Sequence, residues 1–176
     1  MMCDKDQLGR KVSWVVVAMI IALVPSYSVA ADTPQVSLNT SKASPRAVEP
    51  LTQRSILRDY KFAWVNLDHA LQANSTAFLS GLFAGTANSW LNDAVASQRR
   101  NGLSSRYLNQ NHKVEAIFYA PEGDLIELHD TVDYDLQILD GSKAVQNEHV
   151  TVHYVVLMTP AADRWVVRQL QSVPSF

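Results

Sequence analysis

The chain has 176 residues, of which 47% are hydrophobic, and a formal net charge of -2. This length suits one globular domain together with a targeting segment. The near balance of acidic and basic residues excludes the basic excess that is typical of nucleic-acid-binding proteins, so we expect no nucleic acid partner.

Residues 1–30 have the anatomy of a secretory signal peptide. Three basic residues precede an apolar run over 14–24 that ends at Pro25, and the small residues Ser28 and Ala30 follow. This order is typical of an export signal with a cleavage site. A membrane-spanning helix needs roughly 20 apolar residues, which the run does not reach. We therefore expect a cleaved signal peptide and a periplasmic or extracellular protein. The alternative is an uncleaved membrane anchor formed by residues 14–24.

The segments after the signal divide into a linker and a domain. The one cysteine, Cys3, would be removed with the signal, which excludes disulfides, thiolate metal sites and a cysteine nucleophile from the mature protein. Residues 31–50 contain three prolines and several serines and threonines without apolar periodicity. We expect a disordered linker there, because such a stretch cannot bury enough apolar surface to offset its ordering entropy. The folded domain is predicted to occupy residues 51–176.

Three helices are predicted in the first half of this domain. Apolar residues recur at three- and four-residue steps from its start, and this helical pattern stops at Asn74. A short apolar helix over 76–83 and a third helix over 86–100 follow. We expect the third helix to bury Trp90 and Leu91 on its inner side.

Four strands are predicted in the second half. Apolar and polar residues alternate there between turn signals, and an Asp-Gly pair at 140–141 favours a tight hairpin. Sequential antiparallel pairing would give a four-stranded meander. The fold class is therefore α+β, with three helices packed on one face of a curved antiparallel sheet. The expected strands are 112–120, 125–139, 148–159 and 165–173.

Three segments of the predicted strands, at 133–135, 152–156 and 163–167, carry a resemblance to a known family. With these segments, the predicted arrangement resembles the NTF2-like superfamily of cone-shaped α+β folds. Within it, the chain is most similar to the IMS-type domains of plastid-division proteins and of bacterial proteins without a known role. The resemblance implies a cone with an internal cavity or a docking surface, and often dimerisation through the open sheet face. The superfamily contains enzymes, ligand binders and docking modules, so the fold alone does not give the function.

Asp130 is the sharpest candidate for catalysis. Alternation along its strand places it on the same face as Leu128, Val132 and Tyr134. On a regular strand the carboxylate would point into an apolar interior, where it would suit general acid–base work with Tyr134 or Tyr60 as a hydrogen-bond donor. A β-bulge near Asp130 would shift the local alternation and leave the carboxylate in water. We favour the bulge.

Aromatic residues and histidines are the remaining candidates. Aromatic side chains at helix and strand spacing are most often core. A metal site from two histidines, 129 and 153, and a nearby aspartate would have few ligands, and we expect an exposed polar face instead. No metal and no cofactor is predicted. If a ligand pocket forms in the cone, its expected lining is Tyr60, Trp64, Phe118 and Tyr134.

Two functions from different classes follow. The first is an exported, non-enzymatic module that docks a protein or peptide partner, or a second copy, with its curved sheet. The second is a small-molecule binder or a lyase- or isomerase-type enzyme that uses the cone cavity with Asp130 as the base. The first is favoured, because the sequence contains a predicted export signal and a spacer but no convincing acid–base set.

Overall fold

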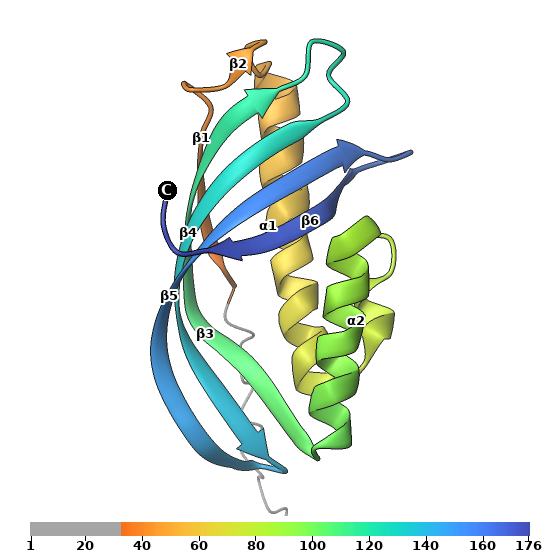
Figure 1. The fold of residues 1–176 in the computed structure, drawn as a ribbon, viewed down its shortest axis with the longest axis vertical. Coiled ribbons are helices and arrows are strands. Elements are labelled where there is room, and N and C mark those ends of the chain that lie inside the picture. Colours follow the sequence, from red (N-terminus) through yellow and green to blue (C-terminus); the bar gives the residue numbers. More distant parts are fainter. Residues whose placement is uncertain (1–32) are drawn as a thin grey trace, which may run out of the picture. The chain divides into compact units, whose positions relative to one another are not determined.

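The computed structural model describes residues 33–176, which form one unit built from a six-stranded sheet and two α-helices (Figure 1). The chain is therefore of the α+β class. Neither α-helix of this described part is long and apolar enough to cross a membrane. The elements are β1 (Gln35–Asn39), β2 (Ser44–Pro45), α1 (Pro50–Ala73), the 3-10 helix η1 (Thr76–Leu79), α2 (Gly85–Arg100), β3 (Leu103–Tyr119), β4 (Ile126–Asp140), β5 (Lys143–Pro160) and β6 (Trp165–Val173).

The sheet has the strand order β1-β3-β4-β5-β6, and β2 pairs with β3 beside β1. The four long strands are antiparallel to their neighbours, whereas β1 and β2 run parallel to β3. Register shifts interrupt β3 between Leu108 and Asn111 and between Ala116 and Phe118. Such bulges bend a strand and increase its twist. They accompany the strong curvature of β3, β4 and β5 in Figure 1.

Helix α1 packs its apolar stripe against the concave side of the sheet. Pro50 stands in its first turn, where a missing N–H costs nothing, and the helix ends at Asn74, which takes the left-handed conformation with φ 51°. The backbone N–H of Asn74 donates to the carbonyl of Ala70 and so closes the last turn. The buried apolar stripe of α1 consists of Ile56, Tyr60, Ala63, Trp64, Leu67, Ala70 and Leu71.

The linker prediction is wrong for the part that the structure describes. Residues of β1 and β2 lie in the predicted linker but pair their backbones with β3. Val36 and Leu38 also pack against the core, so a short alternating pattern is stabilised by a neighbouring strand that is distant in sequence. The sheet accordingly has six strands rather than four. The predicted signal peptide and the anchor alternative lie outside the described residues.

The three-helix prediction is also wrong in its second helix. Of residues 76–83, Thr76–Leu79 form a short 3-10 helix, and the chain then passes Gly81, whose φ of +71° is incompatible with a continuing helix. The third predicted helix corresponds to α2. Its buried stripe is Ala87, Leu91 and Val95, and Trp90 lies one position off that stripe with 51% of its surface exposed. The prediction that Trp90 is core is therefore wrong, because neighbouring positions on a helix point about 100° apart.

Candidate functional site

A cluster of three polar side chains lies in the core between α1 and the sheet. The Tyr60 hydroxyl donates a hydrogen bond to the Asp130 Oδ2 atom over 2.6 Å, and the His112 Nδ1 atom lies 2.7 Å from the same oxygen. Tyr60 comes from α1, His112 from β3 and Asp130 from β4. The side chains of His112 and Asp130 are both 0% exposed. The fold thus brings a histidine, an aspartate and a tyrosine together out of contact with water.

Asp130 points inward because β4 is regular where it was expected to bulge. Asp130 pairs with Val114 on one side and Tyr154 on the other, and neither register is interrupted there. The favoured interpretation of a bulge and a solvated carboxylate is therefore wrong. The bulges that curve the sheet lie mainly in β3, and in β4 the alternation that buries Leu128 and Val132 also buries Asp130.

The electrostatics of the cluster keep Tyr60 protonated. Burial, followed by the negative charge of Asp130 and the hydrogen bond to it, holds the pKa of the Tyr60 hydroxyl well above its usual value. Tyr60 is therefore a donor to Asp130 across the accessible pH range. The ring of Trp64 lies 4.5 Å from that of His112, centroid to centroid, and closes the cluster on the helix side. The second carboxylate oxygen of Asp130, Oδ1, is buried and has no hydrogen-bond partner within residues 33–176.

Two of the predicted site residues, Tyr134 and Phe118, do not join this cluster. Tyr134 is buried further along β4, about 13 Å from Asp130 by strand geometry, with its ring 4.6 Å from that of Tyr107. Burial raises the pKa of Tyr134 as well, although a hydrogen bond from Tyr154 opposes this shift. Phe118 lies one residue before the end of β3, and 37% of its surface is exposed. Tyr60 and Trp64 are packed edge to face at 6.3 Å and form part of the core. The structure thus does not gather the four predicted pocket residues around one ligand site.

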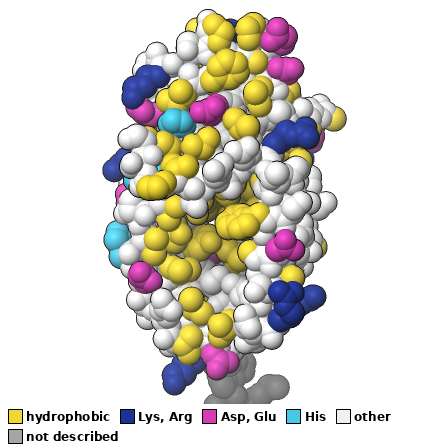
Figure 2. Space-filling view, viewed as in Figure 1, with side chains coloured by type: hydrophobic (Ala, Val, Ile, Leu, Met, Phe, Trp, Pro, Cys, Tyr) yellow, Lys and Arg dark blue, Asp and Glu magenta, His cyan; other side chains and the backbone are white. Residues whose placement is uncertain are grey.

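A hollow opens to the surface where α2 faces β6, the edge strand of the sheet. We call it the α2–β6 hollow, and its volume is about 430 Å³. Figure 2 shows hydrophobic side chains gathered in a depression on this face of the molecule, between the curved strands and α2. None of its lining residues within 33–176 is charged. Its lining residues are Thr86, Trp90, Tyr154, Gln169, Leu170, Gln171 and Ser172.

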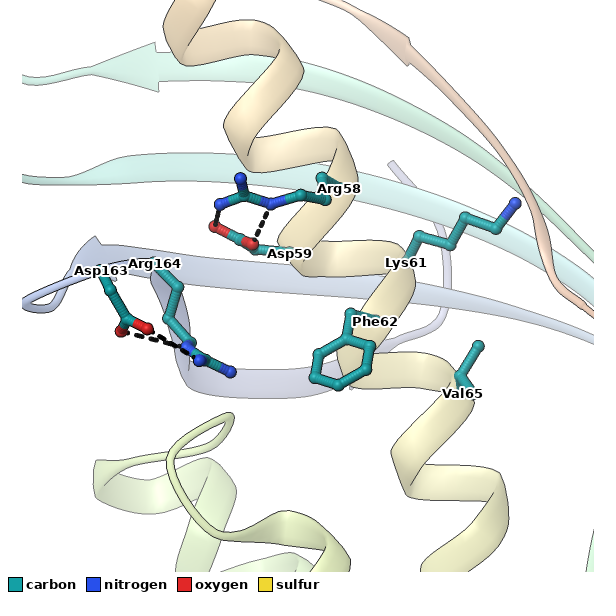
Figure 3. A pocket seen from close by; sticks show the side chains of 7 residues that line it. All are labelled: Arg58, Asp59, Lys61, Phe62, Val65, Asp163 and Arg164. Carbon is teal, nitrogen blue, oxygen red and sulfur yellow. Dashed lines mark hydrogen bonds and ion pairs between the residues drawn. The ribbon is translucent and has the colours of Figure 1, made fainter.

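A second hollow lies beside α1 and has a different character. In Figure 3, Phe62 lies beside two ion pairs, Arg58 with Asp59 and Arg164 with Asp163. Its volume is about 510 Å³. The carboxylate of Asp59 is buried and also accepts the backbone N–H of Trp165, so it fastens α1 to the start of β6. Both arginines are thus paired with carboxylates, and Lys61 is the remaining charged residue among the described lining residues of this hollow.

The histidines of the outer sheet face do not form a metal site. The Nε2 atom of His129 lies 3.1 Å from a carboxylate oxygen of Glu127, and the Nδ1 atom of His153 lies 3.0 Å from the Thr131 hydroxyl oxygen. The rings of both histidines contact Phe176. Within residues 33–176, no group of three or more histidine, cysteine, aspartate or glutamate side chains is arranged to hold a metal ion.

Two residues of these sites were missed from the sequence. His112 is fully buried, and the available signal was its alternation with Val114 and Ala116, which face the core from the same strand. The exposure of Trp90 could have been found from the spacing of Ala87, Leu91 and Val95, which defines the buried stripe without it. The periodicity is present in the sequence in both cases. It was not used for His112, and Trp90 was assigned to the wrong face of its helix.

The sheet topology and its two α-helices define an α+β domain with a strongly curved, mixed sheet. A solved structure with a similar fold is the intermembrane space region of the chloroplast protein ARC6, with a TM-score of 0.56 and 14% sequence identity. The match covers 74% of this chain and 100% of that one. No family model matches the sequence, and no curated protein matches it. The comparison establishes a distant likeness in fold.

Proposed function

We propose that this chain is an exported, non-enzymatic member of the NTF2-like superfamily that docks a protein or peptide partner in the cell envelope. The observation that carries the proposal is the half-exposed Trp90, which lines the α2–β6 hollow together with Tyr154 and Leu170. A helix does not need an exposed tryptophan for its own stability, whereas tryptophan and tyrosine are the residues most enriched at the energetic centres of protein interfaces.

The composition of the hollow supports a protein or peptide partner. Its polar groups are amides and hydroxyls, which donate and accept hydrogen bonds, and its apolar surface comes from Trp90, Tyr154 and Leu170. Neutral polar groups around an aromatic centre are typical of a surface that binds a peptide chain. They are less suited to a highly charged metabolite, which would require basic residues in the lining.

The envelope location rests on two observations. Residues 1–30 have the sequence pattern of an export signal. In addition, the similar solved structure is that of the intermembrane space region of the chloroplast protein ARC6. We extend this setting to the present chain as part of the proposal.

Affinity capture from the native envelope tests the proposal. The domain is used as bait with two variants, Trp90→Ala in the α2–β6 hollow and Phe62→Ala in the hollow beside α1, where Phe62 is 48% exposed and so serves as a matched control. We expect one protein to be retained by the wild type and by Phe62→Ala, and to be lost with Trp90→Ala. Retention by all three baits, or loss with Phe62→Ala alone, would reject docking at this hollow.

A second function is favoured by the buried cluster of Tyr60, His112 and Asp130. An enzyme that abstracts a proton next to a carbonyl could use Asp130 as the base and Tyr60 as the hydrogen-bond donor. Both Asp130 and His112 are 0% exposed, so this function requires the sheet and α1 to open before a substrate can enter. The test is incubation of the domain with a small-molecule extract of the envelope. Conversion of a compound by the wild type, and its loss in Asp130→Asn, would favour the enzyme over the docking module.

A further inference from the structure

The two halves of β6 differ in how their outer edge is used. β6 is the last strand of the sheet, so one of its edges faces away from β5. In the first half this edge is occupied, because the Val167 N–H donates to the Leu82 carbonyl, the Ala84 N–H donates to the Val167 carbonyl, and the Thr86 hydroxyl donates to the Arg168 carbonyl. From Gln169 to Val173 the edge has no backbone partner within residues 33–176.

This open half also lacks the features that keep a strand edge from pairing. Exposed edges in monomeric proteins are usually guarded by lysine, by proline or by a bulge that turns the edge away. Residues 169–173 contain neither a charged residue nor proline, and the register with β5 is unbroken from Gln169 onward. An unguarded edge of this kind is a template for another strand.

Space for an added strand is present on both faces of this edge. The α2–β6 hollow lies on the inner face, on the side of Tyr154 and Leu170. A further hollow of about 440 Å³, which we call the outer β6 hollow, lies on the opposite face over Leu157 and Thr159. The two hollows share Thr86 and Gln169, so they meet at the start of the open edge. The outer β6 hollow is lined by Gly85, Thr86, Leu125, Leu157, Thr159, Arg168 and Gln169.

We propose that the docked partner is an extended peptide that adds to the open edge of β6 as a further strand, with an apolar side chain in the α2–β6 hollow and an adjacent acidic side chain in the outer β6 hollow near Arg168. This inference rests on the proposed docking function and specifies how the partner binds. Side chains of a strand alternate between the two faces of a sheet, so neighbouring residues of such a peptide would enter the two hollows in turn.

The charge of Arg168 determines which of the two hollows would bind the acidic side chain of the peptide. Arg168 is exposed and forms no ion pair within residues 33–176. The inner hollow, by contrast, contains no charged residue and is dominated by Trp90. An arginine guanidinium forms its strongest hydrogen bonds with a carboxylate.

The same charge argues against a second copy of this chain as the occupant. If two β6 edges paired with each other, residues 169–173 of the second copy would approach the first, and that segment carries no carboxylate. Arg168 would then remain without an opposite charge in both copies. A partner peptide with neighbouring acidic and apolar residues would place a carboxylate near Arg168 and an apolar side chain in the α2–β6 hollow.

The experiment uses a synthetic nine-residue peptide in which phenylalanine or valine alternates with glutamate or threonine. Binding to the domain is measured by calorimetry at low salt, and hydrogen exchange locates the contact. We expect binding with protection of backbone amides within 169–173. Two derivatives carry N-methyl groups on the odd or on the even amides. Only one of the two should lose binding, because a strand pairs through one edge at a time.

A charge exchange tests the acidic position. With lysine in place of glutamate, the peptide should bind about tenfold more weakly to the wild type, and the exposed variant Arg168→Glu should reverse this preference. No binding at about 1 mM peptide, equal binding of both N-methylated derivatives, protection outside 169–173, or protection of these amides by self-association of the domain alone would each overturn strand addition. Docking at the hollow would still stand if Trp90→Ala abolished partner capture, so the two proposals fail separately.

Discussion

The Nδ1 atom of His112 lies 2.7 Å from the Oδ2 atom of Asp130, and no part of either side chain reaches solvent. A buried pair of this kind is stable only while both members are present, since removal of one leaves the other without a partner in a medium of low dielectric constant. Tyr60 donates a further hydrogen bond to the same oxygen. The cluster therefore links α1 to the two central strands of the sheet.

Removal of one member should be far more destabilising than replacement of the pair. We expect Asp130→Ala to lower the free energy of unfolding by about 3–5 kcal/mol. The double variant His112→Leu with Asp130→Leu should cost clearly less than the sum of the single changes His112→Leu and Asp130→Leu, because neither member of the pair is then left without the other. The Tyr60 hydroxyl loses its acceptor in every variant that lacks Asp130, so this loss cancels in the comparison. Urea unfolding of the four proteins gives the coupling energy. Additive costs would show that the two side chains do not act as a pair.

Trp90 and Trp64 should differ sharply in their effect on stability. Trp64 is buried against Tyr60 and His112, so Trp64→Ala should cost about 3–5 kcal/mol. Trp90 is half exposed, and Trp90→Ala should change the free energy of unfolding by less than about 1 kcal/mol. Thermal and urea melts of both variants provide the measurement. A loss of similar size in both would mean that Trp90 is core after all.

Asp68 should make the domain less stable as the pH rises. Burial raises the pKa of this carboxyl above its usual value of 3.8, although hydrogen bonds from the Tyr107 N–H and the Gln72 amide oppose the shift. An acid with a raised pKa in the folded state favours folding below its unfolded pKa and loses that contribution as the pH passes its folded pKa. We therefore expect the stability of the wild type relative to Asp68→Asn to be greatest below about pH 3.8 and to fall above it. A stability difference that is constant or rises with pH would contradict this sign.

Gly85 should tolerate alanine less well than Gly102, although both have positive φ. The left-handed conformation costs an L-residue about 1–2 kcal/mol at either position. At Gly85 an added Cβ would also lie 3.0 Å from the Arg168 carbonyl oxygen, whereas at Gly102 it would meet no atom within 4 Å. Urea unfolding of Gly85→Ala and Gly102→Ala measures the difference. Equal losses of the free energy of unfolding would mean that the Arg168 carbonyl moves away from the added Cβ at no energetic cost.

The sequence predicted the parts of the fold that depend on local patterns. β6 was predicted with the bounds that the structure has, and α1 and α2 follow from apolar spacing. β1 was missed because its stability comes from pairing with β3, which lies more than 70 residues away in the chain. A polar, proline-containing stretch gives no local sign of such a partner.

The candidate sites were predicted less well, and for a physical reason in each case. Alternation placed Asp130 on the buried face, but a general expectation about curved sheets led us to favour a bulge there, whereas the nearest bulges lie in β3. Its partner His112 could not be paired with it from sequence, because the contact depends on the register between two strands. The two hollows beside β6 depend on where α2 meets the sheet edge, and no residue pattern predicts that.

Site-specific photo-crosslinking in cells that produce the protein tests docking at the α2–β6 hollow most directly. A photoreactive phenylalanine analogue replaces Trp90 at the hollow or, as a control, Phe62 at the other hollow, and both positions are about half exposed. We predict one covalent adduct with an envelope protein from position 90 and none from position 62. The same adduct from both positions, or an adduct from position 62 alone, would contradict the account.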